Sequence, residues 1–234
     1  VVNTPSRNAR AVSEHALSLM LALARRIPEA HIYVRERRWE NPVEPYTCMR
    51  GIEIAGRTLG IIGLGAIGSN LSQMSTALGM KVVAYDPYVT INHPDVTMVD
   101  LDQLVSHSDF ISIHAAMKAG TKEIITARHL NLMKPTAYIV NTSDPSVVDQ
   151  KALIESLTRR RIAGAAIDVF ETHPISPTNP LLDLDNVVFT PHIGGATEET
   201  IDRHSHMMTK DILRFLEGKK PKHLVNPEVW EHHG

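Results

Sequence analysis

The chain has 234 residues, of which 43% are hydrophobic and 21% charged, and its formal net charge at pH 7 is −2. This length can bury a substantial core, and the near-neutral charge gives no electrostatic reason to expect nucleic acid or a membrane surface as a partner. The single cysteine, Cys48, excludes an internal disulfide and favours a reducing compartment, so we expect a cytoplasmic protein. The sequence begins at Val1 without an initiator methionine, and we expect a fragment of a longer protein.

The first 56 residues predict a loop, two helices and a connecting loop. From Ala11 to Ile27, apolar residues recur at helical spacing and cover more than one face, so this helix needs burial in a core or against a partner. Both remain possible, and we expect a homodimer that forms through this N-terminal helix. Pro28 interrupts the pattern, residues 29–39 predict a polar helix, and residues 41–56 indicate a loop.

Residues 58–87 predict a strand, a tight glycine turn, a helix, a second strand and an acidic residue. Gly63, Gly65 and Gly68 form G-x-G-x-x-G: the first permits the turn, the second lets the backbone approach a pyrophosphate, and the third allows close helix–strand packing. Backbone N–H groups at the start of the helix, at Ala66 and Ile67, point towards such a group. The motif therefore predicts binding of a dinucleotide.

The acid that ends the second predicted strand indicates which dinucleotide is bound. Asp86 follows Gly68 by about 18 residues, close to the spacing expected of a carboxylate that binds the adenosine ribose. A negative charge there favours NAD and would repel the 2′-phosphate of NADP. We therefore expect NAD as the cofactor.

The rest of the chain alternates short apolar strands with helices. Strands are predicted at 96–99, 110–113, 137–140, 163–169 and 187–189, and a closing helix at 196–217. This rhythm is typical of an α/β fold with a Rossmann-type, doubly wound parallel sheet. We expect no metal site, because His204 and His206 are two residues apart on a helix and point in different directions.

Ligands bind at the carboxyl ends of strands in such a sheet, so the residues that follow each strand are candidates for a site. Glu171 and His192 stand out there, because together they would make an acid–base pair. The candidate segments are the glycine turn, Asp86, His114, residues 141–145, residues 168–171 and residues 190–195.

Taken together, these motifs closely resemble the D-isomer-specific 2-hydroxyacid dehydrogenases, a family that includes D-3-phosphoglycerate dehydrogenase. The resemblance extends over nearly the whole chain. It rests on N-A-R-A-V-S-E-H (8–15), G-x-E-x-x-G-R-T-L-G-I-I-G-L-G-A-I-G (51–68), Y-D-P-Y (85–88), L-M-K-P (132–135), V-N-T-S (140–143), A-A-I-D-V-F-E (165–171) and T-P-H-I-G-G-A-T (190–197).

The resemblance implies a domain organisation. Proteins of this family have two lobes, and the lobe that binds substrate is formed mainly from an N-terminal part that this chain lacks. Residues 1–221 would be the NAD-binding domain, including the interface helix. Residues 222–234 would be a tail that returns to the missing lobe.

The resemblance also implies roles for individual residues. His192 would be the acid–base residue that protonates the carbonyl oxygen of a 2-oxo acid, and Glu171 would hold its ring and stabilise the imidazolium. Asp168 would contact the nicotinamide carboxamide. Further residues would line the cofactor: Thr142, Ser143, Gly194 and Gly195.

One position departs from the family pattern. The family clamps the substrate carboxylate with an arginine in V-N-x-x-R-G, but here Asp144 occupies that place and Pro145 replaces the glycine. Lys118 could supply a displaced positive charge, although it also fits a solvated surface residue. Two hypotheses therefore remain. The protein is an active NAD-dependent oxidoreductase that acts on a small-molecule substrate, or it is an NAD(H)-binding scaffold that has lost activity.

Overall fold

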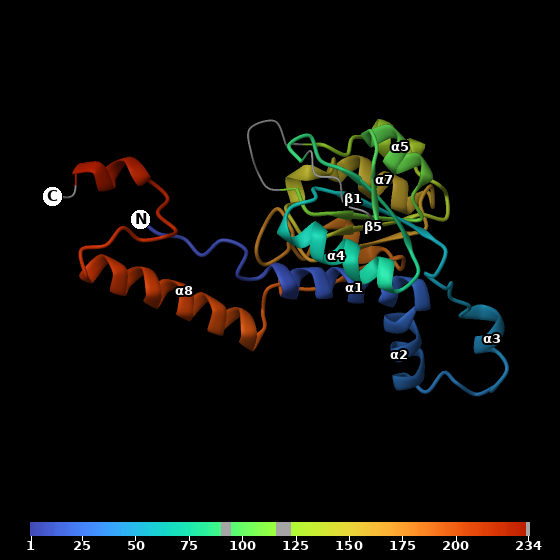
Figure 1. Cartoon of the computed structure of the whole chain (residues 1–234). Coiled ribbons are helices and arrows are strands. Elements are labelled where there is room, and N and C mark those ends of the chain that lie inside the picture. The colour runs from blue at the N-terminus through green and yellow to red at the C-terminus, as the bar shows by residue number, and fades with distance from the viewer. Residues whose placement is uncertain (90–94, 116–122, 233–234) are drawn as a thin grey trace.

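The computed structural model describes residues 1–89, 95–115 and 123–232, and its centre is a seven-stranded parallel sheet (Figure 1). The order across the sheet is β3-β2-β1-β4-β5-β6-β7. The strands are β1 (Thr58–Ile62), β2 (Lys81–Tyr85), β3 (Val96–Met98), β4 (Phe110–Ile113), β5 (Tyr138–Asn141), β6 (Gly164–Ile167) and β7 (Val187–Phe189). The predicted doubly wound α/β sheet is confirmed.

The strand order reverses between β1 and β4. The strands β2 and β3, which follow β1, lie on one side of it in the sheet, and the strands β5, β6 and β7, which follow β4, lie on the opposite side. Their register pairs Ile62 with Ile113, which places the glycine turn after β1 beside His114 after β4. This reversal is where doubly wound sheets open a crevice for ligands. The central strands are apolar and wholly buried, as expected when both faces of a parallel sheet are covered.

Helices cover both faces of the sheet. Helices α1 (Ala9–Arg25) and α4 (Ala66–Ala77) lie on one face, and α5 (Leu101–His107) and α7 (Gln150–Thr158) lie on the other with α6 (Ala127–Leu132) (Figure 1). Asp100 and Asp149 are the N-caps of α5 and α7, and their side chains accept the backbone N–H groups of Gln103 and Ala152. No helix in the described residues is long and apolar enough to cross a membrane.

The N-terminal helix owes its wide apolar surface to burial within this chain. Helix α1 packs against α4 and across β5, β6 and β7, and Ala16 and Met20 are completely buried. The helix ends at Arg25, and the next residue, its C-cap Arg26, adopts a left-handed conformation (φ 53°). Pro28 therefore does not cause the break as predicted; it lies in the first turn of α2 (Ile27–Arg35), where a missing N–H costs little.

Other predicted boundaries differ by a few residues. Helix α2 ends at Arg35, before the predicted limit, and the predicted loop at 41–56 contains the short helix α3 (Pro45–Cys48). Strand β6 ends at Ile167, although the buried run continues to Phe170, because the chain there turns towards the site. The described residues also form three short 3₁₀ helices: η1 (Pro145–Val147), η2 (Pro180–Asp183) and η3 (Pro227–His232).

The long helix α8 (Glu198–Leu216) extends away from the sheet, beside both chain ends (Figure 1). Asp211 on this helix accepts the backbone N–H groups of Lys222 and His223, and Val2 pairs with Leu224 in an antiparallel bridge. The C-terminal segment thus packs on α8 and on the N-terminal residues.

Candidate active site

The glycine turn after β1 has the geometry of a phosphate cradle. Gly63 has a φ of +92°, and a Cβ there would lie 2.7 Å from the carbonyl oxygen of His114. A Cβ on Gly68 would collide with the carbonyl oxygen of Gly63, so this residue permits close packing of α4 on β1. At Gly65, in contrast, a Cβ would meet no atom within 4 Å. The two outer glycines serve the fold, and Gly65 leaves open space beside the start of α4.

Asp86, at the end of β2, is joined to this turn. Its Oδ2 atom accepts the backbone N–H of Leu64 at 2.9 Å, and its Oδ1 atom accepts that of Tyr88 at 2.9 Å. A carboxylate oxygen has a second lone pair, so both oxygens can also accept a hydroxyl. The carboxylate is therefore fixed in orientation and half-buried at the position expected for a ribose contact.

A cavity of about 390 Å³ lies between α1, α4 and the carboxyl ends of the strands. It brings together residues from the ends of β4, β5 and β6 and from the loop after β7. Its lining consists of Asn8, Val12, Ile67, His114, Ala115, Thr142, Ser143, Asp144, Asp168, His192, Gly194 and Gly195.

Two buried polar atoms at this cavity have no partner in the described part of the chain: Nδ1 of His114 and Oγ1 of Thr142. Burial lowers the pKa of His114 to about 4, so its ring is neutral at physiological pH. Buried polar groups without partners are costly and uncommon in folded proteins. Together with the open space at Gly65, they fit a site that a polar ligand such as a dinucleotide completes.

Asp168 holds the loop that carries His192. Its Oδ1 atom accepts the Thr190 hydroxyl at 2.6 Å and the Ile193 N–H at 2.9 Å, and its Oδ2 atom accepts the Gly194 N–H at 2.9 Å. Burial alone would raise the pKa of Asp168, but these bonds and one from His15 outweigh it and lower the pKa to about 2. The carboxylate is 1% exposed and is anchored on the same residues that flank His192.

His15 ties this loop to α1. Its Nε2 atom lies 3.0 Å from Oγ1 of Thr190 and 3.4 Å from Oδ1 of Asp168. Because the Thr190 hydroxyl already donates its proton to Asp168, Nε2 of His15 must be the donor in this contact. The N-terminal helix therefore helps to fix the site through a ring that the sequence analysis did not assign.

The structure pairs His192 with His173 and not with Glu171. Nδ1 of His192 and Nε2 of His173 share a hydrogen bond of 2.9 Å, and the ring centroids are 4.9 Å apart. Glu171 is exposed, and no bond joins it to His192 among the described residues. The predicted contact between His192 and Glu171 is therefore corrected. Glu171 and His173 both lie in an irregular loop after β6, and the path of this loop brings His173 to His192.

Asp144 lies in the cavity wall as the N-cap of η1. Its Oδ1 atom accepts the backbone N–H of Ser146 at 2.8 Å and the Ser146 hydroxyl at 2.6 Å, while its backbone oxygen accepts the Asn141 side-chain amide. Asp144 thus lines the same cavity as His192. Lys118, the predicted source of a compensating charge, lies outside the described residues.

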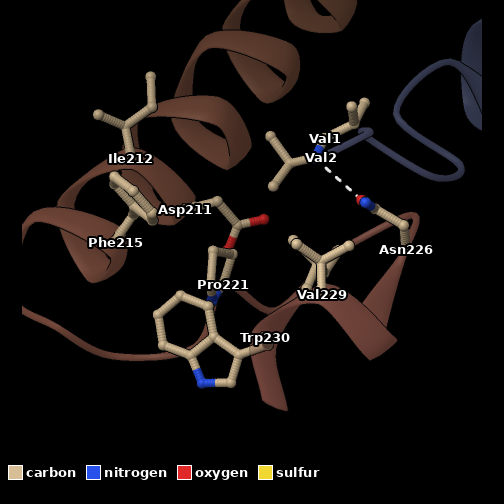
Figure 2. Close-up of a pocket in the computed structure, with 10 residues that line it drawn as sticks. Val1, Val2, Asp211, Ile212, Phe215, Pro221, Asn226, Val229 and Trp230 are labelled. Atoms are coloured by element: carbon tan, nitrogen blue, oxygen red, sulfur yellow. Dashed lines mark hydrogen bonds between the residues drawn. The ribbon is translucent and has the colours of Figure 1, made fainter. Parts of the chain in front are cut away.

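A second cavity, of about 290 Å³, lies far along the chain from this site, between α8 and the two chain ends (Figure 2). Figure 2 shows the side chains of Ile212, Phe215, Val229 and Trp230 around it, with a bond of 3.0 Å from the N-terminal amine of Val1 to Asn226. The lining is mostly apolar. In the described ranges, no three histidine, cysteine or acidic side chains gather as they would around a metal ion.

Eight of the residues named from the sequence line this cavity: Ile67, Thr142, Ser143, Asp144, Asp168, His192, Gly194 and Gly195. The residues that the sequence analysis missed are Asn8 and Val12 on or before α1, and His15 and His173, which act through bonds to other residues. The one sequence signal for His173 is its position in the loop that follows β6, close to Asp168 and Glu171.

The fold and site together define a dinucleotide-binding domain of an α/β dehydrogenase. The family description "D-isomer specific 2-hydroxyacid dehydrogenase, NAD binding domain" matches residues 17–194. The chain belongs to this family, and NAD is the cofactor of the domain.

Individual relatives agree with this assignment. A glyoxylate reductase of Korarchaeum cryptofilum is 41% identical over 98% of this chain and 70% of the relative, and a D-3-phosphoglycerate dehydrogenase of Synechocystis is 39% identical over 99% of this chain but 42% of the relative. The crystal structure of D-lactate dehydrogenase with NAD⁺ from Lactobacillus jensenii has a TM-score of 0.84 and 28% identity, over 96% of this chain and 71% of that structure. The chain therefore spans about 40 to 70% of the length of these proteins.

Proposed function

We propose that the protein of which this chain is part catalyses hydride transfer between NAD(H) and a 2-oxo or 2-hydroxy acid-like substrate, with His192 as the acid–base residue. When bound, the nicotinamide supplies or accepts the hydride. In the reducing direction, His192 donates its proton to the substrate oxygen as the carbon–oxygen double bond becomes a single bond. In the oxidising direction, the same ring removes that proton.

The observation that carries this proposal is the position of His192 in the cavity beside the glycine cradle. Asp168 fixes the backbone next to His192, and the ring is bonded through Nδ1, so Nε2 is left for a substrate oxygen. The residues that would hold the cofactor are the cradle of Gly63, Gly65 and Gly68, the N–H groups of Ala66 and Ile67, Asp86 for the ribose, and Thr142, Ser143, Gly194 and Gly195 along the cavity. Asp168 would contact the carboxamide.

The charge of Asp144 argues against a free carboxylate at its side of the cavity. Two unit charges about 4 Å apart at an effective dielectric of about 20 interact by about 4 kcal/mol, which here is repulsion. We therefore infer that the substrate presents a neutral or cationic group to Asp144. The alternative is that the protein binds NAD(H) as a scaffold and turns over no 2-oxo acid.

Turnover by the full-length protein distinguishes the two functions. NADH oxidation is followed by absorbance with glyoxylate, pyruvate and 2-oxo acids that carry hydroxyl, amino or phosphate groups. The oxidoreductase predicts turnover of at least one compound and a loss on the order of 10²-fold or more in His192→Gln. NADH binding without turnover of any compound would support the scaffold. Turnover that His192→Gln leaves unchanged would contradict the role of His192.

We also propose that the protein forms a homodimer in the cytoplasm. The apolar face of α1 is buried in its own chain. The proposal of a dimer is therefore supported by exposed apolar residues on the next two helices: Ile32 and Val34 on α2 and Tyr46 on α3, which are 48 to 77% exposed. Light scattering on the purified protein tests this: a monomeric mass would contradict the dimer. The lone cysteine, Cys48, is a free and exposed thiol, which supports a reducing compartment.

A further inference from the structure

The bonded pair of His173 and His192 differs from an acid–base histidine held by a carboxylate. A carboxylate partner stabilises the charged imidazolium, whereas a second imidazole offers no negative charge. His173 is exposed, its Nε2 faces His192, and its ring also contacts Phe170 edge-on at 6.4 Å between centroids. The pair therefore has one end at the cavity and one end in solvent.

The hydrogen bond between the rings couples their protonation. Two neutral imidazoles carry two ring protons, and the 2.9 Å bond holds one of them between Nδ1 of His192 and Nε2 of His173. The second proton is then on one of the two outer nitrogens. If His173 donates the hydrogen bond between the rings, Nε2 of His192 carries a proton and can act as an acid. If His192 donates this bond, its Nε2 atom is unprotonated and can act as a base.

We propose that His173 is a positioning residue that relays protons between solvent and His192. The proposal rests on the acid–base role of His192. In the reducing direction, the Nε2–H bond of His192 breaks as the substrate O–H bond forms, and the bridging proton moves from Nε2 of His173 to Nδ1 of His192. In the same step, a proton from solvent binds Nδ1 of His173. Neither ring bears a net charge before or after the step, and the reverse sequence serves oxidation.

The surroundings of the pair favour a neutral relay. Within the described ranges, no carboxylate forms an ion pair with either ring, and full protonation of both rings would place two positive charges side by side. Asp168 has its charge committed to backbone and hydroxyl donors. The titratable groups near the pair are Asp168 after β6, Glu171 on the same loop, Asp144 after β5, His114 after β4 and His15 on α1.

Three variants at position 173 separate relay from simple positioning. His173→Gln keeps a group that can bond Nδ1 of His192 but cannot pass a proton on, His173→Glu supplies a carboxylate, and His173→Ala removes the partner. His206→Gln is the matched control, because His206 is an exposed histidine on α8 that bonds the backbone of its own helix. Turnover is measured in mixtures of H₂O and D₂O and as a function of pH.

Because two protons move in the relay, a plot of the wild-type turnover rate against the deuterium fraction of the solvent should be curved. In His173→Gln the same plot should be a straight line, and turnover should be lower on the order of 10-fold. His173→Glu should recover turnover, with a linear isotope dependence, and the alkaline limb of 2-oxo acid reduction should shift to higher pH by about 1 unit. His173→Ala should lose at least as much turnover as His173→Gln. Equal rates and equal isotope curves in wild type and His173→Gln would overturn the relay.

A measurement without turnover keeps this inference separate from the proposed function. The ring signals of His192 are titrated by NMR in protein labelled with ¹⁵N-histidine. Coupled rings predict that the midpoint of His192 moves by at least about 0.5 pH unit in His173→Gln and does not move in His206→Gln. An unchanged midpoint in His173→Gln overturns the relay even if the enzyme is active. If the midpoint of His192 shifts in His173→Gln but the wild-type protein turns over no substrate, the two rings are coupled and the proposed oxidoreductase function is contradicted instead.

Discussion

The Oδ2 atom of Asp168 accepts the backbone N–H of Gly194 at 2.9 Å, which ties the end of β6 to the loop that follows β7. A Cβ on Gly194 would lie 3.0 Å from the same oxygen, so the close approach depends on glycine. His192, two residues earlier, has a φ of 57°, a conformation that non-glycine residues seldom adopt. The bonds to Asp168 stabilise the backbone beside this conformation.

Replacement of Asp168 by Asn should change how stability depends on pH. The folded-state pKa of Asp168, about 2, is below its ordinary value of 3.8, so its contribution is present above pH 4 and is lost as the pH falls towards 2. The shift corresponds to about 2 kcal/mol. Urea unfolding of both proteins at pH 7 and at lower pH should show a wild-type advantage of that order at pH 7, which shrinks below pH 4. A constant difference would contradict this account.

His114 should produce a separate pH dependence. Burial lowers its folded-state pKa from 6.5 to about 4, so the unfolded chain takes up a proton at a higher pH than the folded protein. Its neutral form is favoured in the fold, and stability is lost as the pH falls from 6.5 to 4, by up to about 3 kcal/mol. His114→Gln, which cannot be protonated, should lose less stability over this range when unfolding is followed by urea titration. The same slope in both proteins would be the contrary result.

The sequence could predict the cradle because each part of it depends on local rules. Gly63, Gly65 and Gly68 have fixed spacing, β2 ends where its apolar run ends, and side chains after parallel strands share one edge of the sheet. The cavity residues after β5, β6 and β7 follow from that rule alone.

The partner of His192 could not be predicted in this way. Residues 168–173 follow a strand without helical or strand periodicity, and the family resemblance pointed to Glu171, whereas the path of the loop brings His173 to the ring. The role of α1 was open for a similar reason. A helix that is apolar on many sides is compatible with a core or with an interface, and its packing on β5, β6 and β7 shows that it belongs to the core of this chain.

Alanine at Gly65 and at Gly68, two of the three glycines of the cradle, should have opposite effects. Gly65 has a φ of −74° and open space at its Cβ position, so Gly65→Ala should fold with stability within about 0.5 kcal/mol of wild type but bind NADH at least about 10-fold more weakly. Gly68→Ala places a Cβ against the backbone of Gly63 and should destabilise the fold by about 2 kcal/mol or more. Thermal unfolding and fluorescence titration with NADH measure the two effects. Normal NADH affinity in Gly65→Ala would contradict the cradle.

Asp86 should determine the preference for NADH over NADPH. Asp86→Asn keeps an oxygen that can accept the N–H of Leu64, so the turn should be preserved while the charge is removed. The affinity ratio of NADH to NADPH should fall by about 10-fold or more, mainly through tighter NADPH binding, because one charge repulsion near the 2′-phosphate is lost. Fluorescence titration with each dinucleotide measures the ratio. A ratio that stays unchanged would mean that Asp86 does not face the ribose.

Substitutions of Asp144 test whether its negative charge determines which substrate charge the cavity accepts. Asp144→Asn keeps an oxygen that can accept the bonds from Ser146 and removes the negative charge, while Asp144→Arg reverses it. If the cavity repels carboxylates, KM for a simple 2-oxo acid should fall in Asp144→Asn and fall further in Asp144→Arg, by about 10-fold or more for each unit of charge. For a cationic substrate the order should reverse. Steady-state kinetics with glyoxylate and with an amino-substituted 2-oxo acid give both series, and charge-independent KM values would show that Asp144 lies away from the bound substrate.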